Sequence, residues 1–110
     1  MAKGNPNRVT PSSGNVFADL GLRDATELQT KARLGVALCR IVEQRRLTQA
    51  QIAEMLGISQ PKVSALLRYK LEGYSVERLM RFLVALGQDV EIVVRAKPRS
   101  RSARIAVTAA

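Results

Sequence analysis

The polar side chains between residues 48 and 70 are the ones whose types and spacing best indicate a chemistry. They are amides, hydroxyls and cations, with small or rigid residues between them. Such groups make hydrogen bonds to polar edges and to anions, but they include no obvious nucleophile or general base. The candidate contact residues are Thr48, Gln49, Ser59, Gln60, Pro61, Lys62, Ser64, Ala65, Arg68 and Lys70.

These side chains must be positioned by the stretch that carries them, residues 47–68 (LTQAQIAEMLGISQPKVSALLR). Its pattern predicts two short helices joined by a tight turn. Thr48 is a good N-cap, and Gln51 three residues later completes a capping box, so the first helix is expected to begin at Gln49. Gly57 follows the last apolar position, where a chain leaving a helix often adopts a positive φ. Ala53 is small enough for the close approach of two helices that cross at a steep angle.

The second helix of this stretch is expected to bury one side and present the other. Ser59 can cap it, and Pro61 fits its first turn because the missing N–H breaks no hydrogen bond there. Val63, Leu66 and Leu67 recur at helical spacing and are expected to face inward. The polar residues between them are left facing outward, so the whole stretch predicts a helix-turn-helix motif.

The same residues resemble a known family. Over about residues 34–87 the sequence resembles the XRE-type (Cro-like, lambda-repressor-like) helix-turn-helix family in the order and spacing of seven residues from Gln49 to Leu66. Within it the chain looks most like a subgroup with an N-terminal arm and a C-terminal β-strand, which includes HigA-type antitoxins. One departure is Leu67-Arg68-Tyr69, where many members have Glu-x-Gly. The matching positions are Gln49, Ala53, Gly57, Ile58, Val63, Ser64 and Leu66.

This resemblance implies a mainly α lambda-repressor-like bundle with one C-terminal β-strand, and double-stranded DNA as a partner. The helix that begins near Ser59 would enter the major groove. Gln60 can make two hydrogen bonds to adenine. The Ser64 hydroxyl can donate or accept a hydrogen bond at a base edge, and Ala65 can touch a thymine methyl group. Gln49 is placed to reach a phosphate and to support Gln60.

The remaining candidates suit the DNA backbone. Lys62, Arg68 and Lys70 are expected to bind phosphates, and Thr48 and Ser59 mark helix N-termini whose amides can do the same. A purely structural alternative stands beside each group. Thr48 and Ser59 are equally explained as caps, and Ser64 and Ala65 as ordinary solvated surface.

The formal net charge of +9 lies mainly outside the expected domain. Residues 95–104 carry five positive charges and no acid, and residues 1–15 carry two more, which leaves +2 for residues 16–94. The folded part is therefore close to neutral, and a DNA-binding face there must come from local clustering.

Composition excludes several other classes of function. The 110 residues include no histidine, and their one cysteine, Cys39, can form neither an internal disulfide nor a thiolate zinc site. We therefore expect no enzyme activity, no metal and no cofactor. The chain has no apolar run of membrane-spanning length and no signal-peptide pattern, so we expect no membrane association and a reducing cytoplasmic location, on the nucleoid when bound to DNA.

The rest of the chain predicts one domain, residues 15–95, between two tails. Residues 1–14 are rich in Pro, Asn, Ser and Gly and are expected to be disordered. Residues 15–22 are too short for an independent helix and are expected to form an arm packed on the core or on a second subunit. Asp24 and Glu27 predict a capping box that opens a helix to about Arg46, and Ser75 a helix over residues 76–86 that Gly87 ends. The expected buried stripe of the first of these helices is Leu28, Leu34, Leu38, Ile41 and Val42.

Residues 89–95 (DVEIVVR) change to a period of two and predict a strand with Val90, Ile92 and Val94 on one face. A single strand needs a partner for its N–H and C=O groups. The candidates are its own copy in a homodimer, for which these three residues would form the dimer interface, or the arm at residues 16–18 of the same or another chain. Residues 96–110 form a basic, flexible tail that either adds nonspecific phosphate affinity or only improves solubility.

Two functions of different classes follow. The first is a sequence-specific DNA-binding regulator, a dimeric repressor. The second is an antitoxin that neutralises a cognate small RNase toxin by protein–protein contact and regulates its own operon.

Overall fold

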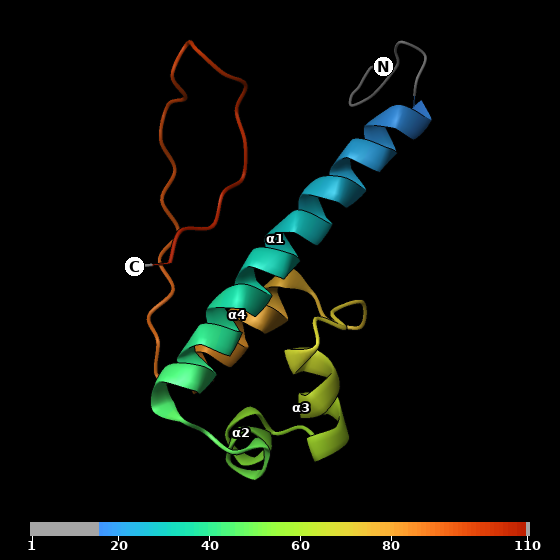
Figure 1. Cartoon of the computed structure of the whole chain (residues 1–110). Coiled ribbons are helices and arrows are strands. Elements are labelled where there is room, and N and C mark those ends of the chain that lie inside the picture. Colours follow the sequence, from blue (N-terminus) through green and yellow to red (C-terminus); the bar gives the residue numbers. More distant parts are fainter. Residues whose placement is uncertain (1–15, 110) are drawn as a thin grey trace.

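The computed structural model describes the backbone of residues 16–109 and the side chains of residues 25–109. Four helices account for its regular structure: α1 (Val16–Arg45), α2 (Gln49–Leu56), α3 (Gln60–Leu67) and α4 (Val76–Ala85). Figure 1 shows α1 as a long rod, with α4 lying along its C-terminal half and α2 and α3 gathered at that same end. None of the helices described is both long enough and apolar enough to cross a bilayer.

The hydrophobic core lies where α1, α3 and α4 meet. Of the inward positions predicted for α3, Val63 and Leu66 are buried, whereas Leu67 is only half-buried. Leu34 and Leu38 come from α1, and Leu71 comes from the loop that follows α3. Ile41 and Val42 of α1 are partly buried against this cluster. The other buried members are Leu66, Leu79, Phe82, Leu83 and Leu86.

The predicted ends of α4 are present in the structure. The Ser75 side chain accepts a hydrogen bond from the Arg78 amide and caps α4. At the other end of α4, Gly87 has φ of 85°, and the Gln88 amide returns to the Leu83 carbonyl at 3.0 Å. Arg45 donates from its guanidinium to the Leu86 carbonyl, which ties the C-terminal ends of α1 and α4 together.

The prediction of an N-terminal arm followed by a helix from Asp24 was wrong. Residues 16–24 belong to α1, which is continuous for 30 residues. Asp24 therefore lies within the helix and cannot be its N-cap. The capping-box pattern is short and also fits a helix interior, and no proline interrupts the preceding residues. Residues 1–14, predicted to be disordered, lie outside the described residues.

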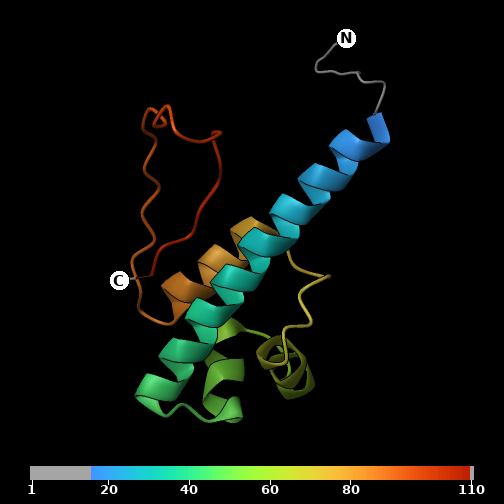
Figure 2. The ribbon, with the colours of Figure 1, turned by 45° about the horizontal axis from the view of Figure 1, so that its top comes forward.

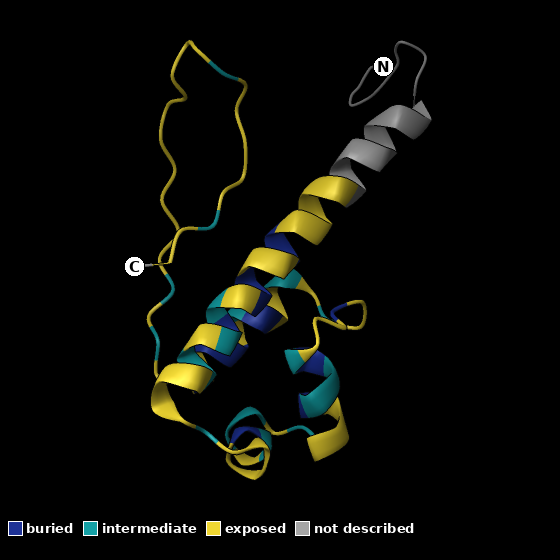
Figure 3. Ribbon diagram, in the orientation of Figure 1, coloured by how far each residue is buried: buried dark blue, intermediate teal, exposed yellow. Residues whose placement is uncertain are grey.

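The N-terminal half of α1 extends beyond α4, which corrects one expected core residue. Leu28 is 59% exposed, whereas Leu38, ten residues later, is 2% exposed. Figure 3 shows the same division, with exposed residues in yellow toward the start of α1 and buried residues in blue where α4 covers it. The start of α4 shares a hollow with Thr26, Glu27 and Thr30, so α4 faces these residues of α1 and leaves Leu28 uncovered.

The predicted strand at residues 89–95 is not confirmed in the single chain. In the described residues these positions are extended and make no ladder with any other segment. The chain rises from α4, turns at residues 99–101 and comes back (Figure 1). In the views of Figures 1 and 2 this C-terminal segment and α3 lie on opposite sides of α1.

The contrast between Leu38 and Leu28 gives a matched test of this fold. We expect Leu38→Ala to lower the free energy of unfolding by about 2–5 kcal/mol, because it leaves a cavity between α1 and α4. Leu28→Ala should change it by less than about 0.5 kcal/mol. Urea denaturation of both variants measures the difference, and equal losses would contradict the described end of the core.

Candidate DNA interface

The predicted helix-turn-helix is present as α2, a three-residue turn and α3. The Ala53 carbonyl accepts hydrogen bonds from the amides of Gly57, at 2.9 Å, and Ile58, at 3.2 Å. Gly57 has φ of 70°, the left-handed conformation that glycine adopts at little cost. This closed turn fixes the direction in which α3 leaves α2.

α3 is held by one side only. Val63 and Leu66 are buried, and Ile52 of α2 is buried with them. Gln60, at the start of the helix, and Lys62 are exposed. Figure 3 shows the first turn of α3 in the colour of exposed residues, at the lower edge of the molecule. The polar side of this helix is therefore free for contact in the chain described.

The other predicted contact residues on α3 differ in their exposure. Pro61 and Arg68 are exposed, whereas Ser64 and Ala65 are half-buried. Gln49 is exposed at the first position of α2. The structure thus brings the start of α2 and the outer side of α3 into one motif, with Ser64 and Ala65 nearer to its base than Gln60.

The charges of the motif are mostly positive. Residues 48–70 contain three cations, Lys62, Arg68 and Lys70, and one acid, Glu54. All four side chains are exposed. The charged part of the motif is thus more basic than the near-neutral domain as a whole.

The structure shows how α3 ends without the Glu-x-Gly sequence that many members of the resembled family have at Leu67-Arg68-Tyr69. Tyr69 has φ of 64°, a left-handed conformation that is uncommon without glycine, and the Lys70 amide returns to the Ala65 carbonyl at 3.0 Å. Tyr69 therefore ends the helix as a glycine would, at a conformational cost of about 1–2 kcal/mol.

Packing of the Tyr69 ring offsets that cost. A Cβ at Gly35 would lie 3.2 Å from Tyr69 Cδ1, so the ring depends on a glycine in α1 for this close approach. The Cys39 thiol points to the Leu67 carbonyl at the end of α3, with the sulfur 3.8 Å from the oxygen. A hydrogen bond with Cys39 is the main reason that the pKa of the Tyr69 hydroxyl is raised. These contacts fix the C-terminal end of α3 against α1.

The two predicted N-caps behave differently. The Thr48 hydroxyl accepts from the Gln51 amide at 3.1 Å, and the Thr48 amide donates to the Gln51 side chain at 2.8 Å. The capping role of Thr48 is therefore observed. Ser59 is the N-cap of α3 by position, but its side chain makes no capping hydrogen bond.

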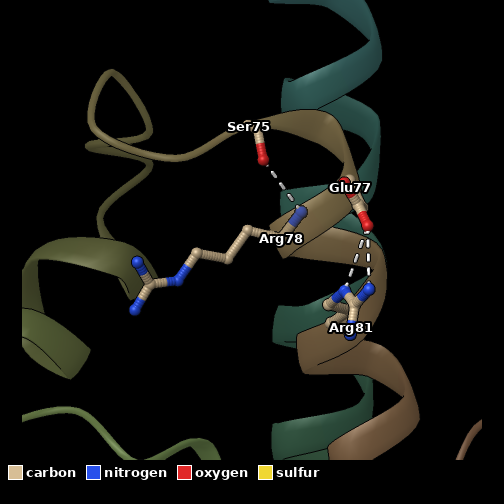
Figure 4. A network of polar contacts seen from close by, with 4 residues as sticks. All are labelled: Ser75, Glu77, Arg78 and Arg81. Atoms are coloured by element: carbon tan, nitrogen blue, oxygen red, sulfur yellow. Dashed lines mark hydrogen bonds and ion pairs between the residues drawn. The ribbon is translucent and has the colours of Figure 1, made fainter.

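Arg78 is a cation beside the motif that the sequence did not indicate as part of it. Its guanidinium carbon lies 5.4 Å from the centre of the Tyr74 ring and 5.5 Å from that of Phe82. Figure 4 shows the side chain extending away from α4, whereas Arg81 pairs with Glu77 on α4 itself at 2.9 Å. Arg78 and Leu56 of α2 line one hollow.

Comparison with known proteins places this geometry in a family. A family model described as a helix-turn-helix domain matches residues 16–95. A solved structure named as an XRE family transcriptional regulator is 65% identical to this chain, with a TM-score of 0.75. The match covers 79% of this chain and 99% of that one. The chain belongs to the XRE family of helix-turn-helix transcriptional regulators. A search of curated proteins gave no match.

Membership of the XRE family establishes the helix-turn-helix as a DNA-binding motif and the protein as a regulator homologue. The match extends through residue 95 and so includes the segment that follows α4. The contact roles assigned to individual residues of α2 and α3 remain predictions, as does the HigA-like subgroup.

Thr48 and Ser59 provide a matched prediction on helix capping. We expect Thr48→Ala to lower the free energy of unfolding by about 1 kcal/mol, because it removes a capping hydrogen bond. Ser59→Ala should have little effect, since its hydroxyl makes no such bond. Thermal unfolding of the two variants tests this, and a loss at Ser59 as large as that at Thr48 would be inconsistent with the capping described.

Proposed function

We propose that this XRE-family protein is a sequence-specific double-stranded DNA-binding repressor that acts as a dimer. The observation that carries the proposal is the arrangement of α3. Its apolar side is buried through Val63 and Leu66, while Gln60 and Lys62 stand exposed at its N-terminal end. A major groove accepts a helix held in this way, and the N-terminal residues of such a helix meet the base edges.

The residues divide into those that specify and those that position. Gln60 is the principal base-reading residue, because its amide can bond both N6 and N7 of adenine. Ser64 and Ala65 are half-buried and would meet only a base edge that lies deep in the groove. Lys62, Arg68 and Lys70 bind phosphates and set the orientation of α3 without selecting sequence. The free N–H groups at the start of α2 and α3 add phosphate contacts.

Arg78 supports the same assignment as a fixed charge beside the motif. Its guanidinium rests near two aromatic rings, so little side-chain freedom is lost when it meets an anion. We assign it to the phosphate-binding group.

Repression by a dimer fits both the size of the reading surface and its charge. One α3 of eight residues can cover only a few base pairs, whereas two copies related by a two-fold axis read paired half-sites about one helical turn apart. A repressor then acts by occupying the site that it reads. This function places the protein on the nucleoid in the cytoplasm.

The alternative is an antitoxin that covers a small RNase toxin and also binds its own operator. The feature that favours it is the exposed C-terminal segment, residues 89–109, which lies away from α3 and could cover a protein while α3 binds DNA. Affinity purification of the full chain, with any gene adjacent to its own co-expressed, separates the two. A stoichiometric small partner whose RNase activity is inhibited would favour the antitoxin.

The proposed roles of Gln60 and Lys62 predict two different losses of DNA binding. We expect Gln60→Ala to weaken binding to the cognate site by about 1–3 kcal/mol and to relax base preference at one position. Lys62→Ala should weaken binding to all sequences alike and reduce the slope of log K against log salt by about one. Titration of labelled duplexes at several salt concentrations measures both, after sites have been selected from genomic fragments.

Two exposed residues on α1 serve as controls for these variants. Gln29→Ala and Arg33→Ala remove an amide and a cation on a helix outside the motif, so both should leave binding unchanged. If the Gln60 and Lys62 variants bind the selected site as the unmodified chain does, α3 is not the reading helix.

A further inference from the structure

The segment that follows α4 leaves most of its apolar side chains, and its backbone groups, without partners in the chain described. Val90 is the exception, because it is partly buried against the core. Ile92, Val93 and Val94 are 77%, 63% and 92% exposed. Residues 89–97 make no hydrogen bond to any other described segment. An exposed, extended and apolar run of this kind is a template for pairing with another strand. Its charges are ordered along the chain, with Asp89 and Glu91 before the apolar centre and Arg95 and Lys97 after it.

We propose that residues 89–97 pair with the same residues of a second copy as an antiparallel two-stranded ribbon, with its two-fold axis at Val93. The proposal rests on the dimeric repressor proposed above and specifies how its two chains are joined. In this register each residue before Val93 lies opposite a residue that is equally far after Val93 in the other chain.

The apolar residues determine which registers are possible. Directly opposite residues of an antiparallel pair share one face of the ribbon. With the axis at Val93, Val90 lies opposite Ala96 of the second copy, and Ile92 lies opposite its Val94. All these side chains then share one continuous apolar face. A shift of one residue would mix them with the charged face.

The charges select among the registers that remain. With the axis at Val93, Glu91 lies opposite Arg95 of the second copy and Asp89 opposite its Lys97, so two-fold symmetry gives each pair twice. An axis at Ile92 would leave Glu91 opposite a valine and keep only the pairing of Asp89 with Arg95. An axis at Val94 would pair Glu91 with Lys97, but it would leave Arg95 opposite a valine and could pair Asp89 only with Arg99, which lies in the turn beyond the extended segment. Parallel pairing in register would place each charge against its own copy, which is unfavourable. The sequence is therefore complementary to itself in the antiparallel direction.

Pairing of the segment within its own chain is less favourable on the same grounds. The chain turns at residues 99–101 and returns (Figure 1), so a hairpin there would pair residues 89–95 with residues 103–109. That hairpin would bring Arg95 close to Arg104, with three more cations between them at the turn. It would also give Glu91 no cation opposite, whereas a second copy offers Arg95.

The adjacent end of α4 can enlarge the contact. A two-stranded ribbon alone is marginally stable in water, so a dimer needs further apolar area. Val84, 57% exposed near the end of α4, lies close in sequence to where the segment begins. The ribbon sets the register, and such flanking surface adds to the affinity.

Charge reversal tests the register in the full chain, with the oligomeric state measured by sedimentation velocity. We expect the unmodified chain to be a dimer. Glu91→Arg and Arg95→Glu should each raise the dimer dissociation constant about tenfold or more, because each places two like-charge pairs across the axis. The double variant E91R/R95E should recover the original constant. An equimolar mixture of the two single variants should form heterodimers, since one chain offers only cations at these positions and the other only acids.

Two controls make the outcome specific to this register. Arg104→Glu makes the same change of charge outside the ribbon and should leave the dimer unchanged. In a Cys39→Ala background, Val93→Cys should form an interchain disulfide on mild oxidation, because Val93 faces its own copy. Ile92→Cys should not, because the two copies of residue 92 are offset by two positions and their sulfurs are too far apart.

The proposal is overturned if the single charge reversals leave the dimer dissociation constant unchanged, or if the mixture of the two single variants forms no heterodimer. A chain ending at Gln88 that remains an equally tight dimer would overturn it too. It is also overturned if Ile92→Cys cross-links and Val93→Cys does not. Binding of the selected duplex is measured on the same samples. If the charge reversals fail to change the dimer but the unmodified chain still binds the selected duplex, only this register is wrong. If the unmodified chain does not distinguish the selected duplex from other sequences, the proposed repressor function is wrong.

Discussion

The burial of Val63 and Leu66 is the constraint on which the DNA-binding surface depends. These two side chains attach α3 to the core by one side, so the other side must face solvent. The closed turn at Gly57 and the packing of Tyr69 against Gly35 hold the two ends of the helix. A reading helix has to be rigid and exposed at once, and these three contacts provide both properties without a large core.

The distribution of charge favours the dimer proposed above. The motif has only three cations against one acid, and each phosphate neutralised contributes a slope of about 0.9 in log affinity against log salt. Two linked copies double these contacts and make the second binding event intramolecular. The strongly basic residues 95–104 lie across α1 from α3, so they cannot replace the second motif on the same half-site in the conformation described.

Local patterns predicted the motif correctly because its geometry is set by local chemistry. The cap at Thr48, the positive φ at Gly57 and the inward side of α3 each depend on residues only a few positions apart. The failures concern features that depend on distant partners. Leu28 was placed in the buried stripe, but nothing in the sequence shows that the start of α4 faces the side of α1 that carries Glu27 and Thr30.

The remaining differences have equally specific causes. Residues 89–95 have the alternation of a strand, but a strand forms only when a second strand is present. Tyr69 ends α3 in a left-handed conformation that usually needs glycine. The packing that offsets the cost of this conformation involves Gly35 in α1, 34 positions away, and no sequence pattern links the two residues. Among the contact residues, helical spacing predicted the exposure of Gln60 and Lys62 but not the partial burial of Ser64 and Ala65. The absence of a capping bond at Ser59 and the position of Arg78 beside two aromatic rings were also not predictable.

If the outer side of α3 meets the bases, binding of DNA must change the surroundings of that side. The most direct measurement is the change in amide and side-chain NMR shifts when a selected duplex is added to the isotopically labelled chain. We expect the largest changes on the backbone and side chains of Gln60 to Ala65 and on the amides at the start of α2. Large changes confined to the C-terminal segment or to the far end of α1, with α3 unaffected, would contradict it.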